Sequence, residues 1–103
     1  MTLHYRQGDV LLMKVERLPE EAVLMETEKH RVVLAYGEVT GHAHAISTDV
    51  AAMYSHNNER FLHVTPGAEL VHEEHSTIFL EPGVYKVVQQ REYTPQELRF
   101  VRD

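Results

Sequence analysis

Short apolar segments separated by turn-forming residues recur along the whole chain of 103 residues. The longest uninterrupted apolar runs are residues 32–36 and 50–54, and strong turn sequences stand at residues 56–59 and at Pro66-Gly67. Strands of about five residues with a turn roughly every ten residues are typical of antiparallel sandwiches and barrels. A chain of this length forms one core. The pattern therefore predicts a single, mostly β domain, folded as a small antiparallel β-barrel or sandwich.

The individual strands follow from alternating or continuous apolar residues between the turns. We expect them at residues 9–15, 31–36, 41–46, 50–54, 61–64, 68–71, 77–80 and 84–93. Thr94 and Glu97 form a capping box with Pro95 at the first helical position, so we expect at most one short helical turn, near the C-terminus. No repeat or linker divides residues 1–103, which supports one domain.

The composition excludes several classes of protein. The chain has no cysteine, so thiolate zinc sites, cysteine-ligated iron–sulfur clusters and cysteine nucleophiles are excluded. Its formal net charge is −6 and it has no cluster of lysine and arginine, so we expect no nucleic-acid partner. Short apolar runs and an N-terminus without signal-peptide features predict a cytoplasmic protein with no membrane partner. Exposed sheet edges favour a homodimer.

Eight histidines are the most unusual feature of the composition, and half of them lie in two short clusters. The clusters are His42-Ala43-His44 and His72-Glu73-Glu74-His75. Neutral imidazole is the commonest metal ligand among side chains, so the clusters predict a site for one divalent transition metal. We expect His42, His44, His72 and His75 to supply its ligands. The alternative is a network of hydrogen bonds between histidines and glutamates on the sheet surface.

The two clusters need different geometry. Residues two apart on a strand point to one face, so we expect His42 and His44 to project together. Thr40 falls on the same face, where its hydroxyl would orient a water at the metal. His72 and His75 are three residues apart and converge only if the chain bends between them. Whether one or both of them reach the metal stays open from the sequence.

The number of imidazoles decides the chemistry. Three leave an open position on zinc, where bound water has a pKa of about 7, whereas four close the site for a structural role. An added carboxylate favours iron or manganese. We expect Glu73 or Glu74 to handle protons, although such a pair is more often simply solvated. The remaining histidines are interpreted as surface or satisfied residues, with pocket lining as the alternative for the last of them: His4, His30, His56 and His63.

A second polar group lies near the C-terminus. On the strand expected at residues 84–93, Gln89, Arg91 and Tyr93 share one face. These side chains are suited to an anionic or carbonyl group, so we interpret them as binding a small-molecule substrate. A polar edge strand in water is an equally good interpretation of the same pattern.

The sequence resembles the cupin family in part. Residues 37–44, GEVTGHAH, are similar to the first half of the cupin motif pattern, and Pro66-Gly67 followed by His72 is similar to the second half. The resemblance implies a small β-barrel and a ligand role for His42, His44 and His72. The first motif is shorter here than in cupins and lacks its glutamate. The segments RQGDVLL, GEVTGHAH, HEEH and QREYTP also resemble a family of small, largely uncharacterised bacterial and phage proteins, which implies a compact stand-alone unit.

Together these features predict a small metalloprotein, with zinc as the first choice of metal and iron or manganese as alternatives. The expected function is that of a metal-dependent lyase or hydrolase, which activates water for hydration or hydrolysis of a small polar substrate. Hydration of the carbonic-anhydrase kind falls within this class. Two alternatives remain open: a non-enzymatic, metal-stabilised binding or regulatory module, and an iron-dependent cupin oxygenase.

Overall fold

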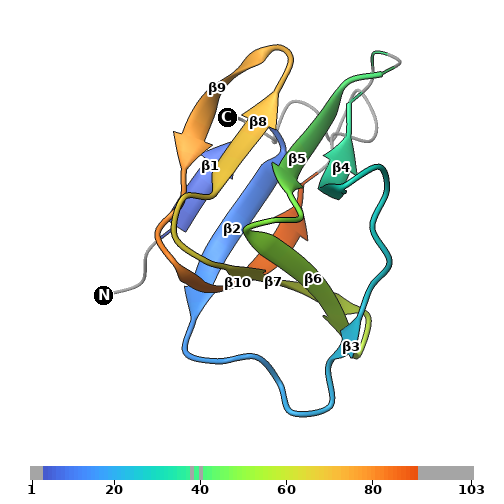
Figure 1. The fold of residues 1–103 in the computed structure, drawn as a ribbon, viewed down its shortest axis with the longest axis vertical. Helices are drawn as coiled ribbons and strands as arrows, with labels where there is room; N and C mark the ends of the chain where they lie inside the picture. The colour runs from blue at the N-terminus through green and yellow to red at the C-terminus, as the bar shows by residue number, and fades with distance from the viewer. Residues whose placement is uncertain (1–3, 38, 40, 91–103) are drawn as a thin grey trace, which may run out of the picture.

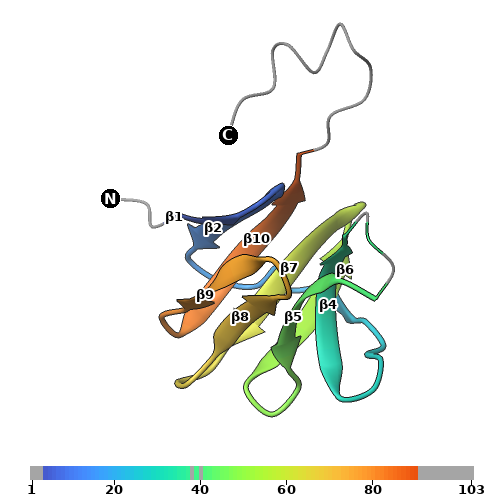
Figure 2. The same cartoon turned by 90° about the horizontal axis from the view of Figure 1, so that it is seen from above.

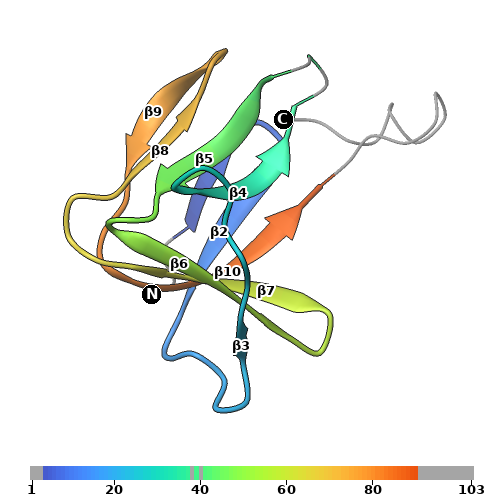
Figure 3. The same ribbon diagram turned by 45° about the vertical axis from the view of Figure 1, so that its right-hand side comes forward.

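The computed structural model describes residues 4–37, 39 and 41–90, which form two antiparallel β-sheets packed face to face (Figure 1). The first sheet contains, in spatial order, β1 (His4–Gln7), β2 (Val10–Val15), β10 (Gly83–Gln89), β7 (Glu59–Val64), β6 (Ala51–His56) and β3 (Val23–Leu24). The second sheet contains, in spatial order, β4 (Arg31–Tyr36), β5 (Ala43–Ser47), β8 (Glu69–His72) and β9 (His75–Phe79). Figures 2 and 3 show the two layers from other directions.

The prediction of a mostly β domain is confirmed, and the two sheets form a sandwich that does not close into a barrel. The strand expected at residues 31–36 matches β4, whereas the one expected at residues 41–46 begins only at Ala43. The sequence does not predict β1 or β3, because the first lacks an apolar alternation and the second has two residues. The helical turn expected near the C-terminus lies outside the described residues.

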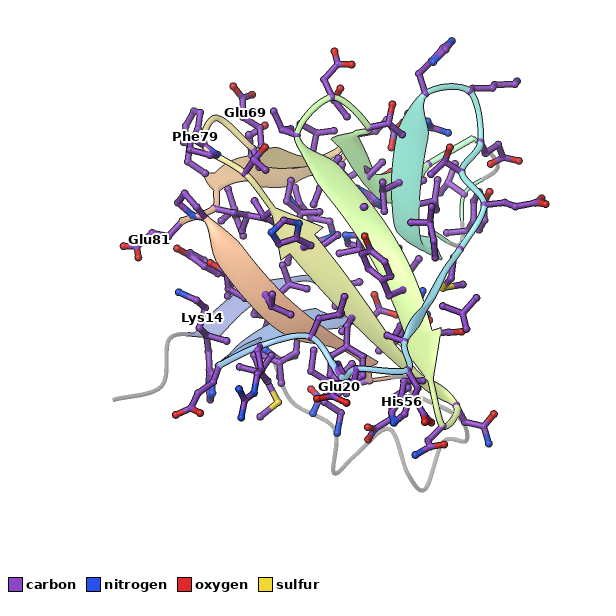
Figure 4. The ribbon with its side chains drawn as sticks, turned by 60° about the horizontal axis from the view of Figure 1, so that its bottom comes forward. Lys14, Glu20, His56, Glu69, Phe79 and Glu81 are labelled. Carbon is purple, nitrogen blue, oxygen red and sulfur yellow. The ribbon has the colours of Figure 1, made fainter. Side chains whose placement is uncertain are left out.

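The core lies between the sheets and is built from alternating strand residues. In the first sheet, Val10 and Leu12 of β2 and Tyr85 of β10 are fully buried. The second sheet contributes Leu34, Ile46 and Leu70, all at most 1% exposed. Burying one such aliphatic side chain stabilises the fold by about 1.5–3 kcal/mol. In contrast, Phe79 at the end of the edge strand β9 is 70% exposed, and Figure 4 shows it at the periphery of the molecule.

Among the described residues no helix is long and apolar enough to cross a membrane.

At one end of the sandwich the apolar core gives way to polar side chains. Gln7 and His44 are the buried polar residues of the described chain, at 3% and 2% exposure. They come from β1 and β5, which belong to different sheets. The turn between β1 and β2, the beginning of β5 and the β8–β9 hairpin all lie toward this end, in the upper part of Figure 1.

Candidate metal centre

His72 and His75 stand directly opposite each other at the end of the β8–β9 hairpin, with Glu73 and Glu74 forming the turn between them. Residues that face each other across a hairpin project to the same side. Their ring centroids are 4.6 Å apart. A two-residue turn thus supplies the bend that the sequence predicts between these two histidines.

His44, the second residue of β5, reaches the same place from the neighbouring strand. Its ring centroid lies 4.3 Å from that of His72 and 5.6 Å from that of His75. Each of the three residues offers one ligand atom, and these atoms lie within 4.8 Å of one another. His44 is buried, His72 is half-buried and His75 is exposed, so this histidine trio opens to solvent beside His75.

Gln7 fixes both the orientation of the His44 ring and the position of its proton. The side-chain Nε2 of Gln7 donates to the backbone oxygen of Leu70 in β8, at 3.0 Å, and to that of Ser76 in β9, at 2.9 Å. Both amide hydrogens are therefore used, and Oε1 faces His44, 2.8 Å from its Nδ1. Because Oε1 only accepts, Nδ1 carries the proton, and Nε2 of the neutral ring keeps a lone pair that can bind a metal.

The turn after β1 supplies a carboxylate that the sequence analysis does not single out. Oδ1 of Asp9 lies 3.4 Å from Nε2 of His44, the nitrogen that Gln7 leaves without a proton. The other carboxylate oxygen, Oδ2, accepts a hydrogen bond from Nε2 of Gln89 at 3.0 Å. Gln89, which the sequence predicts to bind substrate, is therefore brought close to the trio and holds Asp9 there.

Gly8 leaves the space that two of the rings occupy. Its φ of 60° lies in the left-handed region that favours glycine. A Cβ added to Gly8 would lie 2.9 Å from Nε2 of His75 and 3.3 Å from Cε1 of His44. Gln7, Gly8 and Asp9 therefore all contact or accommodate the trio. The segment RQGD is the sequence signal for them, and it is missed when its glycine and aspartate are interpreted only as turn formers.

The neutral rings of His44 and His72 carry their proton on different nitrogens. Burial lowers the pKa of His44 below its ordinary value, and the nearby His72 lowers it further, against the opposite effect of Asp9. His44 is therefore neutral at pH 7, as a ligand must be. Nδ1 of His72 accepts a hydrogen bond from the backbone N–H of Glu74 at 3.0 Å, so neutral His72 carries its proton on Nε2. His72 must give up this bond when it binds a metal.

His42 lies just before β5 and belongs to a second group. Its ring centroid is 5.7 Å from that of His72, and His42, His72 and Glu73 also offer ligand atoms within 4.8 Å of one another. Nδ1 of His42 is buried and makes no hydrogen bond to a described residue, although Oε2 of Glu74 is 3.3 Å away. The four expected ligands are thus divided between two groups that share His72, and His42 and His44 do not project from one strand face as expected.

Glu73 is anchored to the first residue of β5 by a hydrogen bond. Its Oε1 accepts a hydrogen bond from the backbone N–H of Ala43 at 3.0 Å. This bond, together with one from its own backbone N–H, lowers the pKa of Glu73. The side chain is therefore ionised at neutral pH. Thr40, Arg91 and Tyr93, which the sequence also assigns to the site, lie outside the described residues.

A surface hollow of about 450 Å³ opens elsewhere, beside β5 and β8, and its lining includes Ala45, Glu69 and Val71. None of the four clustered histidines lines it. The candidate metal centre is therefore identified by the three converging imidazoles and not by this hollow. Among the other histidines, His4, His30 and His63 are exposed and His56 is half-buried.

A family model described as "Domain of unknown function (DUF8820)" matches residues 6–90. The match covers more than half of the chain, which therefore belongs to this family. It includes every residue of the trio together with Gln7, Asp9 and Gln89, and it ends before Arg91. No curated protein and no solved structure matches the chain.

Proposed function

We propose that this member of the DUF8820 family binds one divalent transition-metal ion, zinc in the first place, through His44, His72 and His75. The observation that carries the proposal is the convergence of three imidazoles, with the proton of His44 held by Gln7 on the nitrogen away from the trio. In metal sites a ligand histidine usually donates its other ring N–H to an acceptor oxygen, which fixes the ring in this way.

Two further observations support a metal at this place. Gly8 has no side chain where a Cβ would crowd His75, so the glycine keeps a ligand nitrogen accessible. The chain has no cysteine, and three imidazoles are a ligand set that zinc accepts without thiolates. Iron and manganese remain alternatives, since imidazole also suits iron and carboxylate suits manganese.

The proposed reaction class is hydration or hydrolysis of a small polar substrate, as in a lyase or hydrolase. Zinc held by three imidazoles keeps a further position and lowers the pKa of water there to about 7. The exposed side of the trio, at His75, gives a substrate access from solvent. Glu73, which accepts the N–H of Ala43, and Glu74, which lies 3.3 Å from Nδ1 of His42, are the two proposed proton carriers. Hydration of the carbonic-anhydrase kind belongs to the same class.

A second candidate function is that of a non-enzymatic, metal-stabilised module, and the position of Asp9 favours it. A carboxylate beside His44 can occupy the position that a catalytic centre keeps for water. An iron-dependent oxygenase of the cupin kind has less support, because the cupin-like ligands His42 and His44 fall into different groups. A homodimer and a cytoplasmic location stay predictions.

Metal titration tests the proposal. Protein freed of metal by a chelator is expected to bind one zinc ion per chain in isothermal titration calorimetry, and its melting temperature is expected to rise on binding. His75→Ala removes an exposed ligand and is expected to weaken zinc binding, while His63→Ala, also at an exposed histidine, is expected to leave it unchanged. Stoichiometric binding that is equal in the two variants, or no binding by the native chain, would contradict the proposed centre.

A further inference from the structure

Two hydrogen-bond acceptors face each other where Asp9 meets His44. Nε2 of His44 has no proton in the neutral ring, because Gln7 holds the proton on Nδ1, and a carboxylate oxygen only accepts. These atoms are 3.4 Å apart, and the His44 side chain is 3% exposed whereas that of Asp9 is 39% exposed. Two acceptors at this distance repel each other, and a cation between them removes the repulsion. The arrangement therefore suits a metal ion shared by His44 and Asp9.

The separation fits two ligands of one zinc ion. Zinc lies about 2.0–2.1 Å from imidazole nitrogen and about 2.0–2.2 Å from carboxylate oxygen, which places two corners of a tetrahedron about 3.3–3.5 Å apart. A carboxylate that instead accepted a hydrogen bond from a water on the metal would lie further from Nε2, because the water itself would take that corner. The distance between Oδ1 of Asp9 and Nε2 of His44 is that of direct neighbours in the coordination sphere.

We infer that Asp9 is a fourth protein ligand of this metal centre, so that the ion is held by three imidazoles and one carboxylate. The inference rests on the proposed function, since it needs the trio to bind a metal. It adds a ligand that comes from the first sheet, whereas the trio comes entirely from the second.

The carboxylate is already held in place by the end of β10. Nε2 of Gln89 donates to Oδ2 of Asp9 at 3.0 Å, and the backbone N–H of Gln90 donates to the backbone oxygen of Asp9 at 2.7 Å. One carboxylate oxygen is thus occupied and the other is directed at His44. The ligand atoms of the trio lie within 4.8 Å of one another without Asp9, so its Oδ1 must move closer to His72 and His75 when the ion binds.

A fourth ligand from Asp9 has a consequence for the reaction. Four protein ligands complete a tetrahedron, so a substrate or water then reaches zinc only as a fifth ligand or by displacing the carboxylate. The role of Asp9 therefore separates the two candidate functions, because a carboxylate that is never displaced makes the centre structural.

Cobalt substitution of an Asp9→Cys variant tests the inference directly. The native chain has no cysteine, so a thiolate-to-cobalt charge-transfer band in the near ultraviolet can come only from residue 9. We expect this band in Asp9→Cys loaded with Co²⁺ and its absence both in the native chain and in Asp49→Cys. Asp49 is the matched control, being an exposed aspartate outside the trio.

Zinc affinity gives a second measurement that needs no new thiol. Asp9→Asn is expected to weaken zinc binding by at least about 10- to 100-fold, the loss already seen when an outer partner of a ligand is removed, while Asp49→Asn leaves it unchanged. If the native chain binds zinc and His75→Ala does not, but Asp9→Cys gives no band and Asp9→Asn binds as tightly as the native chain, the inference fails while the proposed centre stands. If the native chain binds neither zinc nor cobalt, the proposed function fails first and the inference fails with it.

Discussion

The β6–β7 and β8–β9 hairpins have turns of the same length but hold them in different ways. In the first, residues 56–59, Asn57 and Asn58 have φ values of 52° and 65°. In the second, residues 72–75, neither residue of the turn has a positive φ. Positive φ at both central residues matches the twist of a two-residue hairpin, and asparagine tolerates it well. The β6–β7 turn therefore has the conformation that two-residue hairpins prefer, whereas the β8–β9 turn does not.

In the β8–β9 hairpin, the turn and both strands are held by hydrogen bonds to neighbouring strands. Glu73 accepts the backbone N–H of Ala43 in β5, and Gln7 of β1 donates to a backbone oxygen in each strand of the hairpin. Figure 1 shows the two turns at different ends of the sandwich, and Figure 4 shows His56 at the side away from Phe79. The β8–β9 turn, which places two imidazoles side by side, is therefore stabilised by contacts with β1 and β5. The β6–β7 turn is stabilised by the conformation of its own two residues.

Metal affinity provides the largest expected difference between the hairpins. His72→Ala is expected to lower zinc affinity by about 100- to 1000-fold, because a structural zinc site stabilises by about 10–16 kcal/mol shared among four ligands. His56→Ala, at the equivalent position of the β6–β7 hairpin, is expected to change nothing. Calorimetric titration with zinc checks both variants, and equal affinities would remove the functional distinction between the two turns.

The dependence on neighbouring strands is tested by Gln7→Leu. This change leaves the backbone oxygen of Leu70 and Nδ1 of His44 without their partner in a buried place, and removes a half-buried bond to the backbone oxygen of Ser76. Each unsatisfied buried group costs about 1–3 kcal/mol, so the free energy of unfolding in urea is expected to fall by about 2 kcal/mol or more. Gln90→Leu, at an exposed glutamine, serves as control and is expected to cost far less. A small effect of Gln7→Leu would mean that the β8–β9 hairpin is held locally after all.

Backbone preference in the β6–β7 turn is tested by Asn58→Ala. Alanine at a positive φ is strained, so we expect the free energy of unfolding to fall by about 1 kcal/mol. Glu74→Ala, at the equivalent turn position of the β8–β9 hairpin, meets no such strain and is expected to leave stability nearly unchanged. Chemical denaturation followed by circular dichroism measures both. A loss in Glu74→Ala as large as that in Asn58→Ala would show that the two turns make similar demands on the backbone.

The smallest expected effect is a dependence of stability on pH near neutrality, which His44 at the polar end of the sandwich provides. Because the pKa of His44 is lowered in the folded state, the unfolded chain binds more protons below the ordinary histidine pKa of about 6.5. Metal-free protein is therefore expected to lose stability as the pH falls from 6.5 toward the folded pKa of His44. Urea unfolding above pH 5, where Glu73 stays ionised, is expected to show this slope in the native chain and in His63→Gln but less of it in His44→Gln.

The sequence predicts those parts of the site that depend on local spacing. Two histidines on either side of a two-residue segment require a bend, and the hairpin supplies it. The grouping of His42 with His44 is not found. A turn precedes β5, in which the backbone N–H of His42 donates to the backbone oxygen of Val39, and the strand begins only at Ala43. The spacing of two histidines along the sequence does not indicate at which residue the preceding turn ends.

Gln7 and Asp9 lie beyond the reach of local patterns for a different reason. They come from the opposite sheet, and only the stacking of the two sheets brings them to His44. A sequence pattern describes neighbours along one strand, whereas these contacts join residues 7 and 9 to residue 44. The mostly β sandwich is predictable because apolar alternation and turn spacing repeat along the chain. The contacts of Gln7 and Asp9 with His44 are not predictable, because each of them occurs once and no repeated pattern indicates it.

The two hydrogen bonds of the Gln7 amide also bear on how the molecule opens. β1 is an edge strand of the first sheet, and its last residue binds both strands of a hairpin in the second sheet. When β1 detaches, both strands of that hairpin lose a partner at once. Amide protons of β1, β8 and β9 are therefore expected to exchange with solvent as one unit, before those of β7 and β10 at the centre of the first sheet. The three imidazoles then separate while most of the core is still intact.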